Sequence, residues 1–436
     1  MSEKDGSTGR RTLAAGRLAG MLTGLRVLDL SRVLAGPYCT QLLADLGADV
    51  VKVESPRGDD TRGWGPPWLG AESGYFLSVN RGKRSLAVDL KDPRGAELVR
   101  RLAARADVVV ENFKVGDLAR YGLDYASVAA VNPRVVYVSI TGFGQTGPRA
   151  KEPGYDAALQ ALSGVMAMTG EEGRPPVKLP VAFIDVLTGL HAAAGALAAL
   201  RRVALEGEGA HLDVSLFDVA LASSVNQAQG VLLTGEAPRR LGSAHPSIVP
   251  YQSFEASDGA LVIAVGNDAQ FARLCRVLGV PELAEDERYA TNAARVAHRE
   301  EVVGTVARLV AAWRRDELVA ACSAAGVPAT PVLTLPEAFA DPQARARGSV
   351  VTGVRPDGTA VPMVASPLWF ASRADGGDLG LRPDEGAAPV PPALGEHSLE
   401  VLTRDLGMPE DEALRLVEEG VVVVAGRPGP DEPVGR

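Results

Sequence analysis

Three glycines, Gly142, Gly144 and Gly147, spell the pattern G-x-G-x-x-G directly after a predicted strand. That spacing is typical of the loop that binds the pyrophosphate of a dinucleotide, provided that a long helix begins there. Residues 148–154 (PRAKEPG) follow instead and cannot begin such a helix. No strand ending in an acidic residue follows about twenty positions later. We therefore interpret these glycines as a flexible loop near a ligand, not as an NAD or FAD site.

Asp185 is a second candidate for chemistry, because it precedes the most apolar segment of the chain. It stands between Ile184 and Val186, and residues 186–204 have the alanine-rich composition of a buried helix. A helix N-terminus favours negative charge, and poor hydration makes a carboxylate anion more nucleophilic. The same position suits an aspartate that merely caps a helix, so both interpretations stay open from the residues alone.

Other chemistries are disfavoured by residue type and spacing. The cysteines Cys39, Cys275 and Cys322 form no CxxC pair, and the five histidines lack HxH or HxxxH spacing, so no metal site is expected. The net charge of −9 is spread along the chain without a basic stripe, which disfavours a nucleic-acid partner. We find no signal-peptide or membrane-span pattern and expect a cytoplasmic protein without a membrane partner, with residues 1–21 disordered.

The elements that position these residues alternate between strands and helices. A helix beginning near Gly36 and another beginning near Pro93 separate apolar β-branched segments. Such alternation predicts a large, doubly wound, Rossmann-like α/β domain whose ligands lie in the loops beyond the carboxyl ends of the strands. The predicted strands are 26–30, 49–54, 85–90, 106–113, 134–140 and 211–216, and a further helix is predicted over 217–234.

The character of the chain changes near residue 226. A hairpin is predicted around Asp258-Gly259, and helices are predicted over 268–278, 299–313 and 315–325. We therefore expect a smaller α+β domain over 226–330, with the large domain formed by 22–225 and 331–436. The Pro/Gly-rich segments 353–367 and 374–395 are interpreted as linkers or surface loops.

Several long segments resemble the class III CoA-transferases, a family that includes formyl-CoA transferase, carnitine CoA-transferase and α-methylacyl-CoA racemase. Together they span roughly residues 22–422 in the family's order. The resemblance implies coenzyme A and acyl-CoA as substrates, no permanently bound cofactor, and an interlocked homodimer. The segments are LDLSRVLAGPYCTQLLADLGADVVKVE, DDTRGWGPP, SVNRGKRSLAVDLKDPRG, VENFKVGDLARYGLDY, SITGFGQTGP, GYDAALQALSGVMAMTG, AFIDVLTGLHAAAGALAAL and LGEHSLEVL.

The resemblance implies that Asp185 is the nucleophile. Its carboxylate would attack a donor thioester to form a mixed anhydride, and the released CoA thiolate would then form an aspartyl-CoA thioester. In the family's racemases a histidine usually follows the glycine that corresponds to Gly154. Here Tyr155 follows, and a tyrosine with an ordinary pKa near 10 is a poor base. We therefore favour a transferase over the alternatives, a 2-methylacyl-CoA racemase or a non-catalytic CoA-binding protein. Asp156 either supports the site or simply caps a helix.

Positions that correspond to the family's CoA contacts follow the predicted strands. Val33 and Ala35 would meet the adenine–pantetheine part, while Leu34 replaces a glutamine of formyl-CoA transferase, so that contact is absent here. Asn112 and Phe113 would contact pantetheine and adenine. The candidates for the phosphates, which basic side chains bind through charge-assisted hydrogen bonds, are Arg57, Lys91 and Arg120.

Segments 59–81, 242–252 and 265–271 resemble a branch of the family that uses dicarboxylates. This resemblance implies transfer from succinyl-CoA to a dicarboxylate such as glutarate, with Tyr155 among the substrate-binding residues. The second carboxylate needs a cation, and the sequence does not choose among the candidates Arg62, Arg81 and His245. The alternative for His245 is a loop histidine that braces the turn before Pro246.

Overall fold

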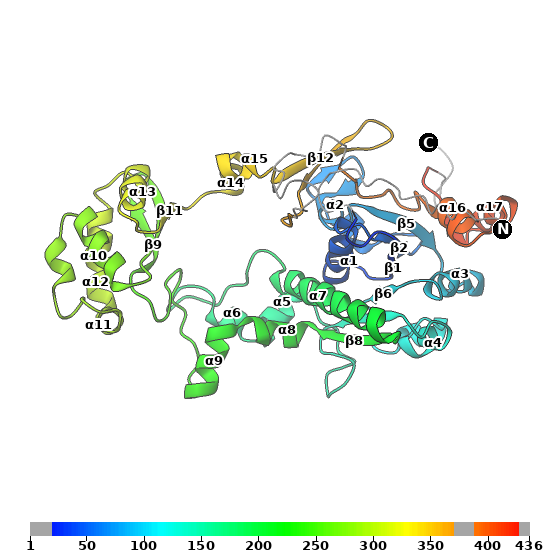
Figure 1. Ribbon diagram of the computed structural model, residues 1–436, viewed down its shortest axis with the longest axis horizontal. Helices are drawn as coiled ribbons and strands as arrows, with labels where there is room; N and C mark the ends of the chain where they lie inside the picture. The colour runs from blue at the N-terminus through cyan, green and yellow to red at the C-terminus, as the bar shows by residue number, and fades with distance from the viewer. Residues whose placement is uncertain (1–19, 370–387, 427–436) are drawn as a thin grey trace, which may run out of the picture. The chain divides into compact units, whose positions relative to one another are not determined.

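The computed structural model describes residues 20–369 and 388–426, and the chain divides into two compact units (Figure 1). The larger unit contains 1–163, 180–228 and 342–436, and the smaller contains 164–179 and 229–341. The segment expected to be disordered lies, up to residue 19, outside the described residues. The second expected linker, 374–395, lies outside them up to residue 387.

A seven-stranded sheet forms the centre of the larger unit, in the order β14-β5-β2-β1-β6-β7-β8. All neighbours are parallel except β14, which runs antiparallel to β5. This confirms the expected α/β class with a mostly parallel sheet. The strands are β1 (Arg26–Asp29), β2 (Asp49–Glu54), β5 (Lys83–Val88), β6 (Val108–Glu111), β7 (Val136–Thr141), β8 (Ala210–Ser215) and β14 (Val422–Val423).

Both faces of this sheet are buried, because successive residues of each strand point into two different apolar cores. Leu28 and Val51 lie in one core, while their neighbours Val27 and Val50 lie in the other. Burial on both faces explains the continuous β-branched sequences of the strands. The first core is covered by α3 (Pro93–Ala103), α4 (Tyr125–Val131), α16 (Ser398–Glu400) and α17 (Glu410–Glu418); the second by α1 (Ala35–Asp45), α5 (Asp156–Leu162), α7 (Phe183–Glu206) and α8 (Leu216–Ser223).

Helix α7 is the longest helix of the described chain, and by length and composition it could cross a membrane. Here its small residues Ala192, Ala193 and Ala196 are buried in the second core. At Gly189, a Cβ atom would lie only 2.6 Å from the carbonyl oxygen of Ala35, the first residue of α1. The two helices therefore pack at close range, one turn beyond the start of α7.

The smaller unit combines a three-stranded antiparallel sheet, in the order β11-β10-β9, with several helices. The expected hairpin is present, but its two-residue turn is Ser257-Asp258, and Gly259 is already the first residue of β10. Phe254, Leu261 and Phe271 belong to one buried core in this unit. Its elements are β9 (Tyr251–Ala256), β10 (Gly259–Ala264), β11 (Ala329–Pro331), α6 (Val165–Met168), α10 (Asp268–Val277), η3 (Pro281–Ala284), α11 (Asn292–Ala297), α12 (Arg299–Val310), α13 (Arg315–Ala324) and α14 (Leu335–Ala340).

The boundaries of the units differ from those expected for the domains. Residues 164–179 belong to the smaller unit, where Gly242 N–H donates to the Gly170 carbonyl at 2.9 Å and Arg240 Nη1 to the Ala167 carbonyl at 3.1 Å. The smaller unit also includes β11, which pairs with β10, and extends beyond it to residue 341. These contacts join segments distant in sequence, so local patterns do not show them.

Two further elements differ from the sequence prediction. The single helix expected over 217–234 is interrupted between α8 and α9 (Val225–Thr234), where Val225 has a φ of 30°. The expected linker 353–367 is wrong in part, because β12 (Val350–Val354) and β13 (Ala360–Val364) form an antiparallel ribbon. The remaining short elements are η1 (Asp60–Gly63), β3 (Trp68–Leu69), β4 (Glu72–Ser73), α2 (Gly74–Ser78), η2 (Asp117–Tyr121), α15 (Pro342–Ala346) and the π-helical turn η5 (Val401–Asp405).

The close packing of α7 on α1 predicts a strong effect of Gly189→Ala. The added methyl group would meet the Ala35 carbonyl, and we expect the free energy of unfolding, measured by urea denaturation, to fall by about 1–3 kcal/mol. Gly304→Ala is the matched control, because Gly304 lies in α12 with no atom near the added Cβ. The control should be more stable by about 0.5–1 kcal/mol. Equal stability of the two variants would contradict the packing argument.

Candidate functional site

The loops that follow β1 and β6 are joined by a side-chain amide. The Asn112 side chain accepts from Arg32 N–H at 2.9 Å and donates to the Arg32 carbonyl at 2.7 Å. This pair of bonds lies at the carboxyl ends of two adjacent parallel strands, where ligands bind in such sheets. It joins Arg32, the residue before the expected CoA contacts Val33, Leu34 and Ala35, to the expected contact Asn112, which Phe113 follows.

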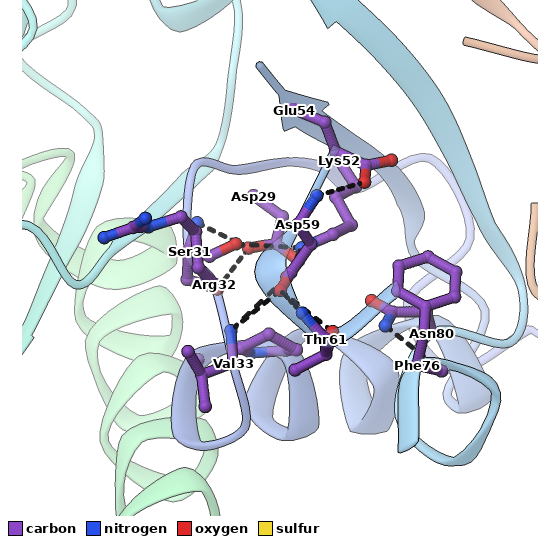
Figure 2. A network of polar contacts seen from close by, with 12 residues as sticks. Asp29, Ser31, Arg32, Val33, Lys52, Glu54, Asp59, Thr61, Phe76 and Asn80 are labelled. Carbon is purple, nitrogen blue, oxygen red and sulfur yellow. Dashed lines mark hydrogen bonds and ion pairs between the residues drawn. The ribbon is translucent and has the colours of Figure 1, made fainter. Parts of the chain in front are cut away.

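A buried carboxylate, Asp59, holds the loop after β1 in place (Figure 2). It accepts from Lys52 Nζ at 2.9 Å, from Thr61 N–H at 3.0 Å and from Val33 N–H at 3.3 Å. The side chains of Lys52 and Asp59 are both 0% exposed. Burial alone would favour their neutral forms, but the ion pair keeps the pKa of Asp59 below and that of Lys52 above the ordinary values.

The backbone of Val33 explains why this loop needs support. Its φ of 69° lies in the left-handed region, which is sterically unfavourable for a β-branched residue. The bond from Val33 N–H to Asp59 stabilises that conformation, as Figure 2 shows. Lys52 Nζ adds a second restraint by donating to the Ser31 carbonyl at 2.9 Å.

A second buried ion pair lies at the end of β1. Asp29 accepts from Lys83 Nζ at 3.0 Å and from Thr40 Oγ1 at 2.6 Å, and also from the Ser31 hydroxyl. Burial opposes the charge of Asp29, but Lys83 and Lys52 lower its pKa to about 2. Burial lowers the pKa of Lys83 to about 8, although Asp29 opposes that shift. The two ion pairs fix both the loop and the first turn of α1.

Sequence reasoning missed these pairs, although the strand over 49–54 contains a signal. Lys52 interrupts the apolar centre of the strand DVVKVE, which was expected to be covered on both faces. A lysine at such a position requires a buried partner, because an unpaired buried charge is very unfavourable. The partner, Asp59, lies seven residues further on, beyond the end of the strand.

Asp185 lies in the first turn of α7, where it is half-buried. Asp156, the first residue of α5, accepts through Oδ2 from Ile184 N–H at 2.8 Å and from Asp185 N–H at 3.3 Å. Burial, and then the negative charge of Asp156, raise the pKa of Asp185 to about 7. Tyr75 in α2 is close enough that burial and the charges of Asp185 and Asp156 raise its pKa to about 12.

The glycine pattern at 142–147 has a packing role in this arrangement. A Cβ atom on Gly142 would lie 2.6 Å from the Cα of Gly154, so the two backbones approach too closely for a side chain. Gly144 and Gly147 have φ values of 86° and 92°, which favour glycine. The close approach fixes the chain just before Tyr155 and Asp156.

The other expected contacts occupy exposed or partly exposed positions. Tyr155 is 68% exposed and precedes α5. Phe113 is half-buried, with the Arg32 guanidinium 5.8 Å from its ring centroid. The expected phosphate contacts are exposed, and all follow strands of the sheet: Arg57 after β2, Lys91 after β5 and Arg120 in η2 after β6.

Arg62 and Arg81 are already paired with carboxylates. Arg62 bonds Glu54 through Nε and Nη2, both at 2.8 Å, and its guanidinium lies 3.6 Å from the centroid of the Phe76 ring. Arg81 Nε donates to Asp45 at 2.8 Å. Both guanidinium groups therefore stabilise the larger unit. That they bind a substrate carboxylate stays a prediction, and these ion pairs do not favour it.

His245 lies in the smaller unit, in the loop before β9. Its Nδ1 accepts from Ser247 N–H at 3.2 Å, which is the turn-bracing contact considered for this residue. In the neutral form the proton must then be on Nε2, which makes that nitrogen a donor. His245 can thus brace its turn and still donate one hydrogen bond.

The buried Lys52–Asp59 pair predicts a large loss of stability in Asp59→Asn. Removing one charge leaves the other buried without a partner, so the free energy of unfolding should fall by about 3–5 kcal/mol in urea denaturation. Asp60→Asn is the matched control, because Asp60 is exposed and pairs with Arg32 at 3.2 Å on the surface. That control should change stability by at most about 1 kcal/mol. The double variant Asp59→Asn/Lys52→Met should be more stable than Asp59→Asn alone, and a strictly additive loss would argue against the pairing.

The raised pKa of Asp185 predicts that this residue destabilises the folded protein at high pH. Between its ordinary pKa of 3.8 and its folded value of about 7, the folded state retains a proton that the unfolded state loses. Stability contributed by the protonated form is therefore lost as pH rises towards 7. We expect Asp185→Asn to raise the urea midpoint at pH 8 and to leave it nearly unchanged at pH 4. A midpoint shift that is the same at both pH values would contradict this assignment.

Known proteins resemble this chain over most of its length. Succinate–glutarate CoA-transferase of Agrobacterium fabrum is 48% identical over 388 residues, which are 87% of this chain and 94% of that protein. Succinyl-CoA:glutarate CoA-transferase of Homo sapiens is 39% identical over 402 residues, 92% of this chain and 90% of that protein. The crystal structure of a CAIB/BAIF family protein from Brucella suis has a TM-score of 0.75 at 46% identity, covering 87% of this chain and 98% of that one.

The sequence pattern of one family extends through both compact units. Residues 22–397 match CoA-transferase family III. This match confirms the resemblance that the segments of the sequence indicated, and with it the expected class of enzyme. The chain belongs to CoA-transferase family III.

Proposed function

We propose that this enzyme moves coenzyme A from succinyl-CoA to a second dicarboxylic acid, such as glutarate, through covalent intermediates on Asp185. The relatives named for succinate, succinyl-CoA and glutarate, at 39–48% identity, support these substrates. The observation that supports the nucleophile best is the position of Asp185, half-buried in the first turn of α7 with its pKa raised to about 7. A carboxylate of higher basicity is a better nucleophile, and at neutral pH a large fraction of it is ionised.

The proposed reaction proceeds by successive acyl transfers to and from the Asp185 carboxylate. The Asp185 carboxylate attacks the thioester carbonyl of succinyl-CoA, the C–S bond breaks, and a mixed anhydride and CoA thiolate form. The thiolate attacks the aspartyl carbonyl, which releases succinate and leaves an aspartyl-CoA thioester. The acceptor carboxylate then attacks the aspartyl-CoA thioester, the C–S bond breaks, and a second mixed anhydride and CoA thiolate form. The thiolate attacks the acceptor carbonyl of this anhydride, the C–O bond to Asp185 breaks, and the new acyl-CoA and the free Asp185 carboxylate are released. Each step forms an oxyanion that main-chain N–H groups would stabilise.

CoA is proposed to bind over the carboxyl ends of β1 and β6. The loop from Val33 through Leu34 to Ala35 would contact pantetheine and adenine, and the same is proposed for Asn112 and Phe113. The Arg32–Asn112 pair and the buried Asp59 support this assignment, because they shape the loop before any ligand arrives. The phosphates are assigned to cations that are exposed and so free to move towards them, namely Arg57, Lys91 and Arg120.

The distal carboxylate of the dicarboxylate is proposed to meet one of three cations, His245, Arg62 or Arg81, with Tyr155 as a further substrate contact. Arg62 and Arg81 are weaker candidates, because Glu54 and Asp45 already bind their guanidinium groups. A neutral histidine whose Nδ1 accepts from Ser247 N–H can donate one directed hydrogen bond through Nε2.

A racemase would need a second acid or base opposite Asp185. Among the described residues, the titratable groups whose charges interact with Asp185 include Asp156 and Tyr75. Tyr75, with a pKa of about 12, is a poor base at neutral pH. Tyr155 occupies the position of the racemase histidine, which leaves the transferase as the better-supported reaction.

We further propose a cytoplasmic, interlocked homodimer. Large apolar side chains on α9 support a partner surface, since Leu232 is 80% and Leu233 77% exposed in the single chain. Apolar exposure of this extent is typical of surfaces that another protein covers.

Asp185→Ala is expected to abolish CoA transfer from succinyl-CoA to glutarate and to leave CoA affinity within about threefold of the wild type. Asp218→Ala is the matched control, because Asp218 is also the third residue of its helix, α8, but is exposed. The control should retain at least about half of the wild-type rate. Chromatography of the CoA esters measures turnover, and calorimetric titration with CoA measures binding.

Trapping during turnover tests the covalent step directly. Hydroxylamine or borohydride should modify Asp185 only when acyl-CoA is present, as read by peptide mass spectrometry. Labelling of another residue, or product formation without any label, would contradict the proposed mechanism. Rapid exchange of the α-hydrogen of a 2-methylacyl-CoA in deuterated water, without an acceptor acid, would instead establish the racemase.

A further inference from the structure

Helix α7 begins without a cap of its own. The residue before it is Ala182, which has no side-chain oxygen, and no side-chain bond to the helix is made from that position. The first N–H groups of a helix need acceptors from elsewhere. Ile184 and Asp185 donate theirs to Oδ2 of Asp156, at 2.8 and 3.3 Å.

Asp156 is held in place for this contact. Its residue exposure is 9%, and its other oxygen, Oδ1, accepts from Gln160 Nε2 at 2.5 Å. Gln160 is itself fully buried one turn along α5. The close approach of Gly142 to Gly154 fixes the chain that leads into this helix. Both oxygens of the Asp156 carboxylate therefore have defined partners.

From this geometry we propose that Asp156 is a positioning residue for the nucleophile. It fixes the main chain of Asp185 and occupies the helix N–H groups that the Asp185 carboxylate would otherwise bind. The inference rests on the proposed function, since it assigns a role to Asp156 only if Asp185 is the nucleophile.

The chemical consequence follows from what each carboxylate bonds. An aspartate near the start of a helix ordinarily accepts from first-turn N–H groups, which stabilises its anion and lowers its basicity. Here Asp156 takes those bonds, and within residues 20–369 and 388–426 no donor bonds the Asp185 carboxylate, so its lone pairs are available to attack the thioester carbonyl. The negative charge of Asp156 also repels that of Asp185, which agrees with the raised pKa of Asp185. Among the described residues, Tyr75 in α2 is a further titratable group near both carboxylates, and it stays neutral at its pKa of about 12.

Asp156→Asn tests this role, because it removes the charge while keeping the shape and one acceptor oxygen. We expect kcat at pH 8 to fall about tenfold through lost positioning and lower basicity, with KM for succinyl-CoA unchanged within about twofold. The acid limb of the kcat–pH profile should move down by about one pH unit, because Asp185 then ionises more easily. Asp286→Asn is the control, since Asp286 also accepts a main-chain N–H, from Arg288 at 2.9 Å, in the smaller unit.

A role of Asp156 in folding alone would lower the amount of active enzyme and leave the acid limb in place, and that outcome would overturn the proposal. Asp156→Glu retains the charge, so its kcat–pH profile should have the same acid limb as the wild type. A shifted acid limb in Asp156→Glu would also overturn the proposal. This test remains available if Asp156→Asn does not fold. Failure of the proposed function is distinguishable, because hydroxylamine or borohydride would then not modify Asp185 in the wild-type enzyme during turnover. A labelled wild type with an unshifted Asp156→Asn profile would refute only the role of Asp156.

Discussion

The buried ion pair between Lys52 and Asp59 is the interaction on which the arrangement of the site depends. Neither side chain reaches solvent, and a buried charge is tolerated only when it is paired and hydrogen-bonded. Asp59 must therefore lie against β2, and its remaining lone pairs must find donors. They find them in Thr61 and in the strained Val33, which couples the shape of the loop after β1 to the centre of the sheet.

Helix packing connects a second buried ion pair, Asp29 with Lys83, to the proposed nucleophile. Asp29 and Lys83 fix the first turn of α1, since Lys83 Nζ also donates to the Pro37 carbonyl at 2.9 Å. Gly189 then allows α7 to pack against the carbonyl of Ala35 at the start of α1. Asp185 lies one helical turn before Gly189, on the same side of α7. The proposed nucleophile and the loop proposed for CoA are thus positioned by one rigid assembly of β1, β2, α1 and α7.

The sequence predicts this assembly well where the signal is local. Strands such as 49–54 are found within a residue or two, because burial on both faces of a parallel sheet produces continuous β-branched segments. The break at Val225 and the placement of 164–179 are missed, because they depend on contacts between distant segments. For Asp156 the sequence leaves two roles open, and the structure shows that it caps α7, a helix that begins 27 residues further along the chain. Propensity within α5 gives no information about such a contact.

Burial affects the carboxylates of this enzyme in opposite ways, depending on the partner that each one meets. Asp29 and Asp59 meet lysines, and their pKa values fall below the ordinary value, so they remain anions that hold the fold together. At Asp185 nothing offsets burial: burial, and then the charge of the second carboxylate Asp156, raise its pKa to about 7. When the environments of acidic groups move their pKa values apart in this way, the groups can take different roles. Here one role is structural and the other chemical. The distinction between an aspartate that stabilises and one proposed to react therefore lies in the neighbouring charge, because burial is common to all three.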